Sequence, residues 1–417
     1  MPKNSVAFIG LGYIGLPTAV MMAQHGLDVT GVDVLPEKVR QINDGEISIV
    51  EPGLEDALKD VLAKGTFHAT TAVPHADAYI IAVPTPFTSS HDVDMKFIYS
   101  AAESIAPQLV GDELVVLEST SPPLTTQKMA ERILELRPDL SLDNGKTEST
   151  KPVIHVAHCP ERILPGRAME ELRTNARIIG GISSEATRRA TEIYSSFCEG
   201  ELLQTNARTA ELSKLTENSF RDVNIAFANE LSLICEKLDI DVWELIRLAN
   251  HHPRVNILQP GPGVGGHCIA VDPWFIVSAA PEEARLIHTA RLVNDSKPEW
   301  VFSKVQRAVE DNNATDVAVL GLSFKADIDD LRESPSLHIA QEIAQRLPGI
   351  SVHAVEPNIS KLPESLEKFN NVTLDQLAPA ISQSQIVLLL VDHKPFKEVT
   401  AAQLKNKTVI DTKGLWI

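Results

Sequence analysis

Short apolar runs alternate with stretches of helical period along the first third of the chain. The run Ser5–Ile9 predicts a strand, Leu16–Gln24 an apolar helix, and Asp28–Val32 a second strand. Apolar runs at Ala78–Val83 and Leu114–Glu118 predict further strands. Near-continuous apolar runs joined by helical segments are typical of a parallel sheet covered by helices on both faces. The pattern therefore predicts a doubly wound α/β domain at the N-terminus.

This first sheet is expected to end near residue 200. The stretch Pro138–Lys151 is polar and predicts a loop, and Val153–Ala157 predicts another strand. The apolar run Arg177–Gly181 then predicts the strand that closes the sheet. Residues 1–203 are therefore expected to form one domain.

Helical periodicity replaces the strand pattern in the middle of the chain. Apolar residues recur three or four positions apart from Ala207 to Lys237, and a helix of this length spans about 45 Å. Such a helix normally bridges domains or forms a subunit interface. Shorter helices are expected over Val242–Ala249 and Glu282–Arg307. We therefore predict a helical domain over residues 204–312 and a homodimer formed through the long helix.

A second α/β pattern fills residues 313–417. Four apolar runs predict strands, namely Val317–Leu320, Val352–Val355, Ile386–Val391 and Thr408–Ile410. This segment has no Gly-x-Gly-x-x-Gly turn, so we expect it to bind a different ligand, such as the mononucleotide part of a substrate, or to serve as a structural lid. The predicted fold is α/β, with two Rossmann-like doubly wound domains joined by a central helical domain.

Composition and charge narrow the classes of function. A chain of 417 residues with 43% hydrophobic and 23% charged residues is typical of a multidomain soluble protein. The formal net charge of −18 argues against nucleic acid or an anionic membrane as a partner, and no apolar run is long enough to span a bilayer. The four cysteines are widely spaced without metal-ligand spacing, and the N-terminus lacks a signal-peptide pattern. We expect reduced thiols, no metal and a cytoplasmic location.

A dinucleotide-binding fingerprint follows the first strand. Its turn consists of Gly10, Gly12, Tyr13, Ile14 and Gly15, placed between a predicted strand and a predicted helix. Asp33 ends the next strand about twenty residues later, where it can accept hydrogen bonds from ribose hydroxyls. A carboxylate there repels a 2′-phosphate, which favours NAD over NADP. The alternative is a strand-to-helix turn that binds no ligand.

Polar turns follow two further strands. Thr85 follows one strand, Thr120 follows the next, and Thr126 lies a few residues beyond. Ligands of open parallel sheets lie at the carboxyl ends of the strands, so these threonines are candidates to line the nicotinamide side. Each alone is equally typical of a turn or a helix cap.

A glycine- and proline-rich stretch, Gly261–Trp274, presents Cys268 and, four residues later, Asp272. Such a backbone can approach a ligand closely, a thiolate can attack a carbonyl carbon, and an aspartate can orient a water. The alternative is a tight loop that ends in a buried structural cysteine.

Three polar residues of the long helix share one face. Lys214, Asn218 and Arg221 are spaced i, i+4 and i+7. They form either part of a site or a solvated stripe.

Together these features resemble the nucleotide-sugar 6-dehydrogenases. The resemblance covers essentially the whole chain and rests on Gly10-x-Gly12-x-x-Gly15, Glu118-Ser119-Thr120, Cys159-Pro160-Glu161-Arg162, Glu211-Leu212-Ser213-Lys214-Leu215-x-x-Asn218, Gly265-Gly266-His267-Cys268, Phe324-Lys325 and Arg332-Glu333-Ser334. It implies two successive NAD-dependent oxidations that convert the sugar C6 alcohol to a carboxylate.

The resemblance also implies the catalytic roles. Asp272 with Lys214 deprotonates the alcohol, and Lys214 with Asn218 stabilises the developing oxyanion. Cys268 adds to the aldehyde, giving a thiohemiacetal and then a thioester, which water hydrolyses with Glu161 or Asp272 as base. Lys214 is the cation expected to lower the pKa of the Cys268 thiol.

Further positions match the family's contacts to its ligands. Those expected to bind the nucleotide sugar are Arg162, Ile163, Lys214, Asn218, Arg221, His252, Arg254, Gly265 and Lys325. Arg332 and Lys413 match positions near the cofactor, and Arg254 is expected to reach across the dimer interface.

Two positions bear on the substrate. In the family pattern that UDP-glucose enzymes follow, Glu stands at the position of Pro165 and Ser at the position of His267. This difference argues against UDP-glucose as the substrate. The resemblance instead implies UDP-N-acetyl-D-mannosamine, oxidised for surface polysaccharide synthesis. The alternatives are oxidation of UDP-N-acetylglucosamine or UDP-glucose, and a catalytically silent nucleotide-binding regulatory protein.

Overall fold

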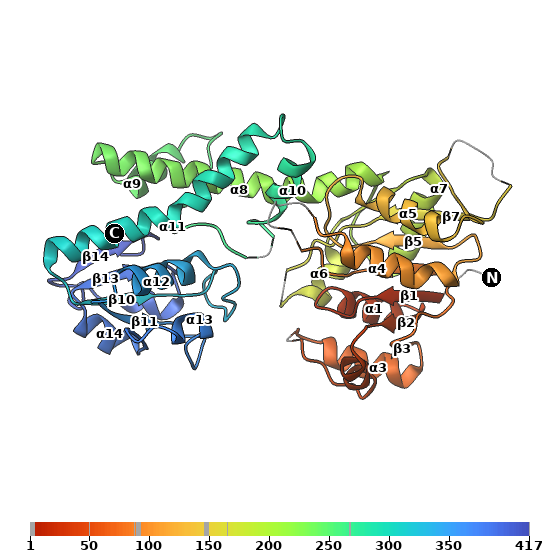
Figure 1. Ribbon diagram of the computed structural model, residues 1–417, viewed down its shortest axis with the longest axis horizontal. Coiled ribbons are helices and arrows are strands. Elements are labelled where there is room, and N and C mark those ends of the chain that lie inside the picture. The colour runs from red at the N-terminus through yellow and green to blue at the C-terminus, as the bar shows by residue number, and fades with distance from the viewer. Residues whose placement is uncertain are drawn as a thin grey trace. The chain divides into compact units, whose positions relative to one another are not determined.

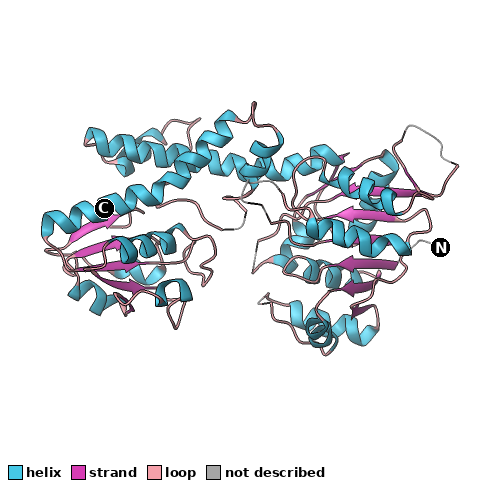
Figure 2. Cartoon of the chain, in the orientation of Figure 1, coloured by secondary structure: helices cyan, strands magenta, loops and turns pink. Residues whose placement is uncertain are grey.

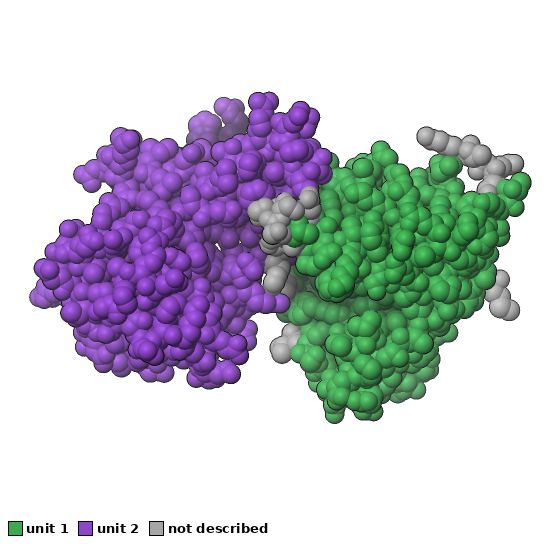
Figure 3. Space-filling model, in the orientation of Figure 1, with its two compact units in different colours: residues 1–216 green, residues 217–417 purple. Residues whose placement is uncertain are grey.

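The computed structural model describes residues 5–49, 51–86, 88, 93–145, 150–164, 166–266 and 268–416. It divides the chain into two compact units, Met1–Thr216 and Glu217–Ile417 (Figure 3). Helix α8 (Ala207–Leu238) runs from the first unit into the second. The three-domain division at residues 203 and 312 stays a prediction.

The first unit is built on one mixed sheet with the strand order β3-β2-β1-β4-β5-β7-β8-β9, with β6 paired to β7 (Figure 1). The strands are β1 (Ser5–Ile9), β2 (Asp28–Val32), β3 (Phe67–Thr70), β4 (Ala78–Ile81), β5 (Leu114–Leu117), β6 (Ser141–Leu142), β7 (Val153–His158), β8 (Arg177–Gly181) and β9 (Leu202–Asn206). All described pairs are parallel except β7 with β8.

Helices cover both faces of this sheet (Figure 2). They are α1 (Gly15–Gln24), α2 (Pro36–Asn43), α3 (Leu54–Lys64), α4 (Lys96–Ile105), α5 (Thr125–Leu136), α6 (Ala168–Thr174) and α7 (Ser184–Tyr194). Alternate residues of β1 face opposite cores: Val6 and Phe8 pack with α1, α3 and α7, whereas Ala7 and Ile9 pack with α4 and α5. The predicted doubly wound arrangement is confirmed.

Three strands of the first unit, β3, β6 and β9, were not predicted from the apolar pattern. The sheet does not end at β8, because β9 pairs with it in parallel, and the segment expected to be a loop contains the short strand β6. Every residue of β9 is exposed or half-buried. An edge strand of this kind carries no apolar run, and two residues are too few to show any period.

The second unit contains a parallel sheet with the strand order β12-β11-β10-β13-β14. Its strands are β10 (Asp316–Leu320), β11 (Ser351–Val355), β12 (Val372–Leu374), β13 (Ile386–Leu389) and β14 (Thr408–Asp411). Helices α11 (Arg285–Asn312) and α12 (Pro335–Arg346) pack on one face, and α14 (Leu377–Gln383) packs on the other. The short helix α13 (Glu364–Glu367) adds to the first of these cores.

The remaining helices of this unit are the second part of α8, α9 (Val242–Ala249) and α10 (Asp272–Ala279). The prediction of a helix over Glu282–Arg307 corresponds to α11, which begins three residues later and continues to Asn312. Helix α10 was not predicted, since the apolar stretch after Asp272 is short. No described helix is both long and apolar enough to cross a membrane.

Candidate active site

The glycine turn after β1 leaves open space where a ligand can approach. Gly10 has φ +99°, and a Cβ there would lie 2.4 Å from the Ala82 carbonyl oxygen. A Cβ on Gly15 would lie 1.9 Å from the Gly10 oxygen, so the fold itself requires both glycines. A Cβ on Gly12 would meet nothing within 4 Å. Gly12 is therefore the position where a missing side chain leaves room for a pyrophosphate.

An acid stands at the end of β2, as the fingerprint predicts. Asp33 Oδ2 accepts a hydrogen bond from the Leu11 N–H at 3.2 Å and lies 2.9 Å from Lys38 Nζ. Among the described residues, the N-cap residue Ile14 makes no side-chain cap hydrogen bond, and the N-terminus of a helix is a favourable place for an anion. The residues present thus fit a dinucleotide, with Lys38 as a neighbouring cation that the sequence did not single out.

Tyr13 joins the glycine turn to the loop that carries Glu161. Its hydroxyl donates to Glu51 Oε2 at 2.8 Å, and the same oxygen accepts the Gly166 N–H at 2.8 Å. The other Glu51 oxygen accepts the Ala168 N–H at 2.6 Å. Burial and the hydrogen bond with Glu51 raise the pKa of Tyr13 to about 12, so it remains a neutral donor. Sequence reasoning missed Glu51, because its partners Tyr13, Gly166 and Ala168 lie 38, 115 and 117 positions away.

The strand-end threonines are only partly brought together. Thr85 Oγ1 donates to the Thr120 carbonyl oxygen at 2.7 Å, which joins the turns after β4 and β5. Thr126 is fully buried in the first turn of α5, and its hydroxyl has no hydrogen-bond partner among the described residues. Thr85 and Thr120 therefore form one cluster, whereas the side chain of Thr126 is buried and does not reach the protein surface.

Glu211 anchors the start of the long helix. Its two carboxylate oxygens accept the N–H groups of Leu124 and Thr126, each at 2.7 Å, at the N-terminus of α5. A carboxylate is favoured there by the orphan N–H groups and by the helix dipole. Lys214 follows one turn later on α8 and is half-buried. Glu211 belongs to the motif around Lys214 but had been assigned no role.

The segment after β7 carries three predicted residues. Glu161 is buried and lies 2.9 Å from Arg177 Nη2 through its Oε2 atom. Arg162 Nη1 donates to the Ala176 carbonyl oxygen at 3.1 Å, and Ile163 packs against the hydrophobic core. Pro165, which bears on the substrate, lies outside the described residues.

The cysteine loop exposes one thiol. Cys268 is exposed, whereas Cys159, Cys198 and Cys235 are buried. The alternative of a buried structural cysteine is therefore wrong for Cys268. His267 lies outside the described residues.

Asp272 is fixed beside this cysteine. It is the first residue of α10, and its N–H donates to the Cys268 carbonyl oxygen at 2.9 Å. Asn218 Nδ2 donates to Asp272 Oδ2 at 2.6 Å, and both side chains are buried. Two predicted residues fifty-four positions apart thus form one pair, in which the amide of Asn218 orients the carboxylate of Asp272.

Close packing and buried polar contacts hold the cysteine loop. A Cβ on Gly265 would lie 2.4 Å from the Glu333 carbonyl oxygen, so Gly265 acts by permitting this approach. The Gly261 N–H donates to Asn229 Oδ1 at 2.9 Å, and Asn229 Nδ2 donates to Asn294 Oδ1 at 2.8 Å. Asn294 in turn donates to Asp222, which pairs with the buried Arg291. A polar network between α8 and α11 therefore sets the position of the loop.

The predicted cations of the second unit fall into two groups. Arg221, His252, Arg254 and Lys325 are exposed. Arg332 and Lys413 each lie near a carboxylate of their own unit: Arg332 Nη2 is 2.6 Å from Asp330, and Lys413 Nζ is 3.5 Å from Asp392. The four exposed cations are available to an anionic ligand. Arg332 and Lys413 can bind such a ligand only by giving up their carboxylate partners.

The cysteine loop borders a cavity of about 350 Å³. Val264 of the loop lines it together with Asn294 and Asp295 of α11 and with Glu333, Ser334, Pro335, Leu337 and His338. The predicted site residues divide between the units: Glu161 and Lys214 lie in the first, and Asn218, Cys268 and Asp272 lie in the second.

Three family models match successive parts of the chain. They are the NAD binding domain at residues 4–198, the central domain at 208–296 and the UDP binding domain at 318–416 of the UDP-glucose/GDP-mannose dehydrogenase family. The chain belongs to this family. NAD as cofactor and a UDP-sugar as substrate class, both predicted from the sequence, are thereby confirmed.

Individual relatives extend along the whole chain. The UDP-N-acetyl-D-mannosamine dehydrogenase of Yersinia pestis is 54% identical, with both proteins covered completely. The NDP-N-acetyl-D-galactosaminuronic acid dehydrogenase of Ralstonia nicotianae is 51% identical over 99% of this chain and 96% of its own. The solved UDP-N-acetyl-mannosamine dehydrogenase of S. aureus has a TM-score of 0.84 at 40% identity, covering 99% of this chain and 95% of that one.

Proposed function

We propose that this member of the family oxidises UDP-N-acetyl-D-mannosamine at C6 to UDP-N-acetyl-D-mannosaminuronate, for surface polysaccharide synthesis. The similarity to a relative of that name over the full length supports this substrate. The observation that carries the chemistry is the exposed thiol of Cys268, followed by the buried Asn218–Asp272 pair. NAD, when bound, accepts a hydride in each of the two oxidations.

The side chains supply proton transfer and covalent capture. In this proposal Asp272 with Lys214 removes the proton of the C6 alcohol, and Lys214 with Asn218 stabilises negative charge on the sugar oxygen. One N–H of the Asn218 amide donates to Asp272, and the amide group carries a second N–H that can donate to the sugar oxygen. Cys268 then adds to the aldehyde and forms the thiohemiacetal that is oxidised to a thioester, and Glu161 or Asp272 activates the water that hydrolyses it.

The ligand contacts are part of the same proposal. The dinucleotide is held by Gly12, by Asp33 and by the cluster of Thr85 with Thr120. Arg332 and Lys413 bind it as well, after each has left its own carboxylate partner. The exposed cations bind the diphosphate and uridine, since Arg is well suited to bidentate contact with phosphate. These are Arg221, His252, Arg254 and Lys325.

A homodimer is also proposed. Phe220, Phe227 and Ile234 are exposed at 69%, 51% and 46%, and their spacing of seven places them on one face of α8. In the dimer Arg254 would reach the partner's substrate. Phe227→Asp is expected to give monomers in light scattering, with Val110→Asp, at an apolar residue that is 64% exposed and lies outside α8, as the matched control. Monomeric wild-type protein would overturn the dimer.

A cytoplasmic location is proposed as well, supported by four free thiols.

A panel of nucleotide sugars tests the substrate. UDP-N-acetylmannosamine is expected to give two NADH per sugar, and UDP-N-acetylglucosamine and UDP-glucose far less. UDP-N-acetylgalactosamine belongs in the panel, because the Ralstonia relative is nearly as similar. Preferential turnover of another sugar would overturn the substrate. Binding without any NADH would favour the silent regulatory protein.

The thioester route has its own test. Cys268→Ser is expected to lower acid formation at least about a thousandfold, because no thioester can form. Cys198→Ser, at a buried cysteine of the first unit, is the matched control and should stay active. Acid release by Cys268→Ser near the wild-type rate would rule out this route.

A further inference from the structure

Two buried carboxylates of the first unit share a single guanidinium group. Glu118 follows β5, Glu161 follows β7, and Arg177 opens β8, with exposures of 1%, 8% and 4%. Arg177 Nη2 lies 2.9 Å from Glu161 Oε2, and Nη1 lies 3.7 Å from Glu118 Oε1. The mechanism above uses Glu161 and assigns nothing to Glu118.

The two carboxylates are not equally supported. Glu161 has both oxygens engaged, since Oε1 also accepts the Arg162 N–H at 2.6 Å. Glu118 Oε1 accepts the Tyr194 hydroxyl at 2.8 Å, whereas Oε2 is buried with no hydrogen-bond partner among the described residues. An ionised carboxylate with an unsolvated, unpaired oxygen is costly in a protein interior.

The other groups that face Glu118 bring no compensating charge. Tyr194 comes from α7, and Cys159 Sγ lies 3.9 Å from Arg177 Nη1. Burial raises the pKa of Cys159 to about 12 and raises the pKa of Tyr194 well above its usual value, so both remain neutral near pH 7. Arg177 is thus the only cation facing the pair among the described residues that interact with Glu118.

A charge count decides where a proton resides. With both carboxylates ionised, the buried cluster would carry a net negative charge, and two like charges in one site retain a proton between them. The less supported carboxylate keeps it. Consistent with this count, burial raises the pKa of Glu118 to about 8, although Arg177 opposes the shift.

We propose that Glu118 holds the proton of this cluster and acts as a positioning residue for Glu161. When Glu118 is a neutral acid, Arg177 pairs with Glu161 alone. Glu161 is then an ionised carboxylate with a fixed orientation beside Arg162, in the segment after β7. When Glu118 ionises, it competes for Arg177, and Glu161 loses its fixed orientation. This inference rests on the proposed function, in which Glu161 activates water for thioester hydrolysis.

Glu118→Gln tests the role in hydrolysis, because an amide keeps the shape and the neutral state. At pH 7 the variant is expected to hydrolyse the thioester within about twofold of wild type. From pH 7 to about pH 9.5 the ratio of wild-type to variant rate is expected to fall at least about threefold, since only wild type ionises. The measurement is single-turnover acid release together with the mass of the enzyme-bound thioester.

Tyr194→Phe sharpens this test. The Tyr194 hydroxyl stabilises ionised Glu118, so its removal is expected to move the high-pH decline to higher pH. A constant rate ratio from pH 7 to 9.5, or a loss of more than about tenfold for Glu118→Gln at pH 7, would overturn the positioning role.

A stability measurement separates this inference from the proposed function. The Tm of Glu118→Gln minus that of wild type is expected to widen between about pH 5 and pH 8, because wild type must retain a proton that its unfolded chain releases. A flat difference would overturn the proton assignment. If no UDP-sugar yields NADH with wild type, the proposed function fails and the role in hydrolysis fails with it, while a widening Tm difference still places the proton on Glu118.

Discussion

The two sheets of this chain begin alike and then differ in how the first turn is filled. Gly10, with φ +99°, directly follows β1, and Gly321, with φ +94°, directly follows β10. A Cβ on either glycine would lie 2.4 Å from a neighbour, the Ala82 oxygen in one sheet and Val391 in the other. An acid follows the next strand in both sheets, Asp33 in the first and Glu356 in the second.

The difference lies in what each acid binds. Asp33 accepts one N–H of its turn and pairs with Lys38, and Ile14, the N-cap residue of α1, makes no side-chain cap hydrogen bond with the described residues. Glu356 accepts the N–H groups of Leu322 and Ser323 and pairs with the buried His393 at 3.0 Å. The second turn therefore satisfies its own donors, whereas the first leaves donors for a ligand. We infer that the UDP binding domain holds its nucleotide through groups other than these two N–H donors.

The largest expected effects come from the paired glycines. Gly10→Ala and Gly321→Ala should each destabilise the protein by about 3 kcal/mol or more, because each adds a clash to a strained φ. Only Gly10→Ala should also abolish NAD binding. Guanidinium unfolding and NAD titration measure the two effects.

The matched control for this pair is Gly26→Ala. Gly26 has φ +92° but no atom within 4 Å of an added Cβ, so the cost should be about 1 kcal/mol. If Gly321→Ala weakened NAD binding as much as Gly10→Ala does, the two turns would not be separate in function.

Gly12 should separate ligand binding from stability. Gly12→Ala meets no protein atom within 4 Å, so stability should change by less than about 1 kcal/mol. NAD affinity should fall at least about a hundredfold, since the methyl group occupies the space of the pyrophosphate. Gly349→Ala in the second unit is equally unhindered and should change neither quantity. Unchanged NAD affinity in Gly12→Ala would contradict the assignment of this turn as the cofactor cradle.

Several elements that position the site were predicted because local periodicity encodes them. The first strand, its glycine turn, Asp33 and the long helix α8 are as predicted, whereas the helices between β2 and β9 and the strands β3, β6, β9 and β12 were not predicted. The individual site residues could be placed on elements by spacing and by the family resemblance.

The partners of those residues could not be predicted. Glu51, Glu211 and Asn229 reach residues that lie from thirty-two to one hundred and seventeen positions away. Such pairs depend on how the elements pack, and no local pattern carries that information. The closed turn around Glu356 has the same origin, since His393 comes from a third strand end.

The two acids should respond differently when neutralised. Asp33→Asn should weaken NAD about tenfold with little change in stability, because it loses ribose contacts. Glu356→Gln should leave NAD affinity unchanged and destabilise the protein by about 2 kcal/mol at pH 7, because a buried carboxylate loses its charge-assisted bonds.

The effect at Glu356 should depend on pH. Burial favours the protonated form, but hydrogen bonds from His393 and the backbone prevail and lower the pKa of Glu356. A lowered pKa gives stability that is present above the pKa of the unfolded chain and is lost as pH falls below about 4.5. The difference between Glu356→Gln and wild type should therefore shrink in acid unfolding series. A difference that stays constant down to about pH 3 would contradict this account.

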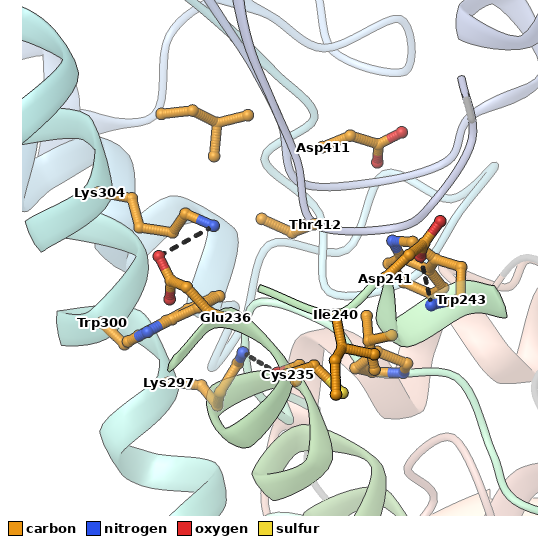
Figure 4. A pocket seen from close by; sticks show the side chains of 14 residues that line it. Cys235, Glu236, Ile240, Asp241, Trp243, Lys297, Trp300, Lys304, Asp411 and Thr412 are labelled. Atoms are coloured by element: carbon orange, nitrogen blue, oxygen red, sulfur yellow. Dashed lines mark hydrogen bonds and ion pairs between the residues drawn. The ribbon is translucent and has the colours of Figure 1, made fainter. Parts of the chain in front are cut away.

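A buried lysine gives the second unit the counterpart of Glu118. Lys297 of α11 borders a cavity of about 230 Å³ and donates to Ser232 Oγ at 2.8 Å (Figure 4). Lys297 and Lys304 both lie against the ring of Trp300, and Glu236 pairs with Lys304. Burial, with the charge of Lys304, lowers the pKa of Lys297 to about 7. Glu118 in the first unit and Lys297 in the second are thus an acid and a base whose pKa values burial shifts in opposite directions, each toward the neutral form.

Lys297→Met should have the smallest effect at neutral pH, within about 1 kcal/mol, because methionine conserves most of the volume. Ser232 keeps its own bond to the Asn229 carbonyl oxygen, so the substitution leaves no unpaired donor there. In wild type the lowered pKa means that the unfolded chain binds more protons above about pH 7, so wild-type stability should rise with pH by at most about 1.4 kcal/mol per unit. Any advantage of Lys297→Met should therefore shrink between about pH 7 and 10, whereas that of Glu118→Gln grows from about pH 5 to 8 and then stays level. Thermal unfolding at a series of pH values measures the stability of each variant relative to wild type. If this difference changed with pH in the same direction for both variants, burial would not shift the two pKa values in opposite directions.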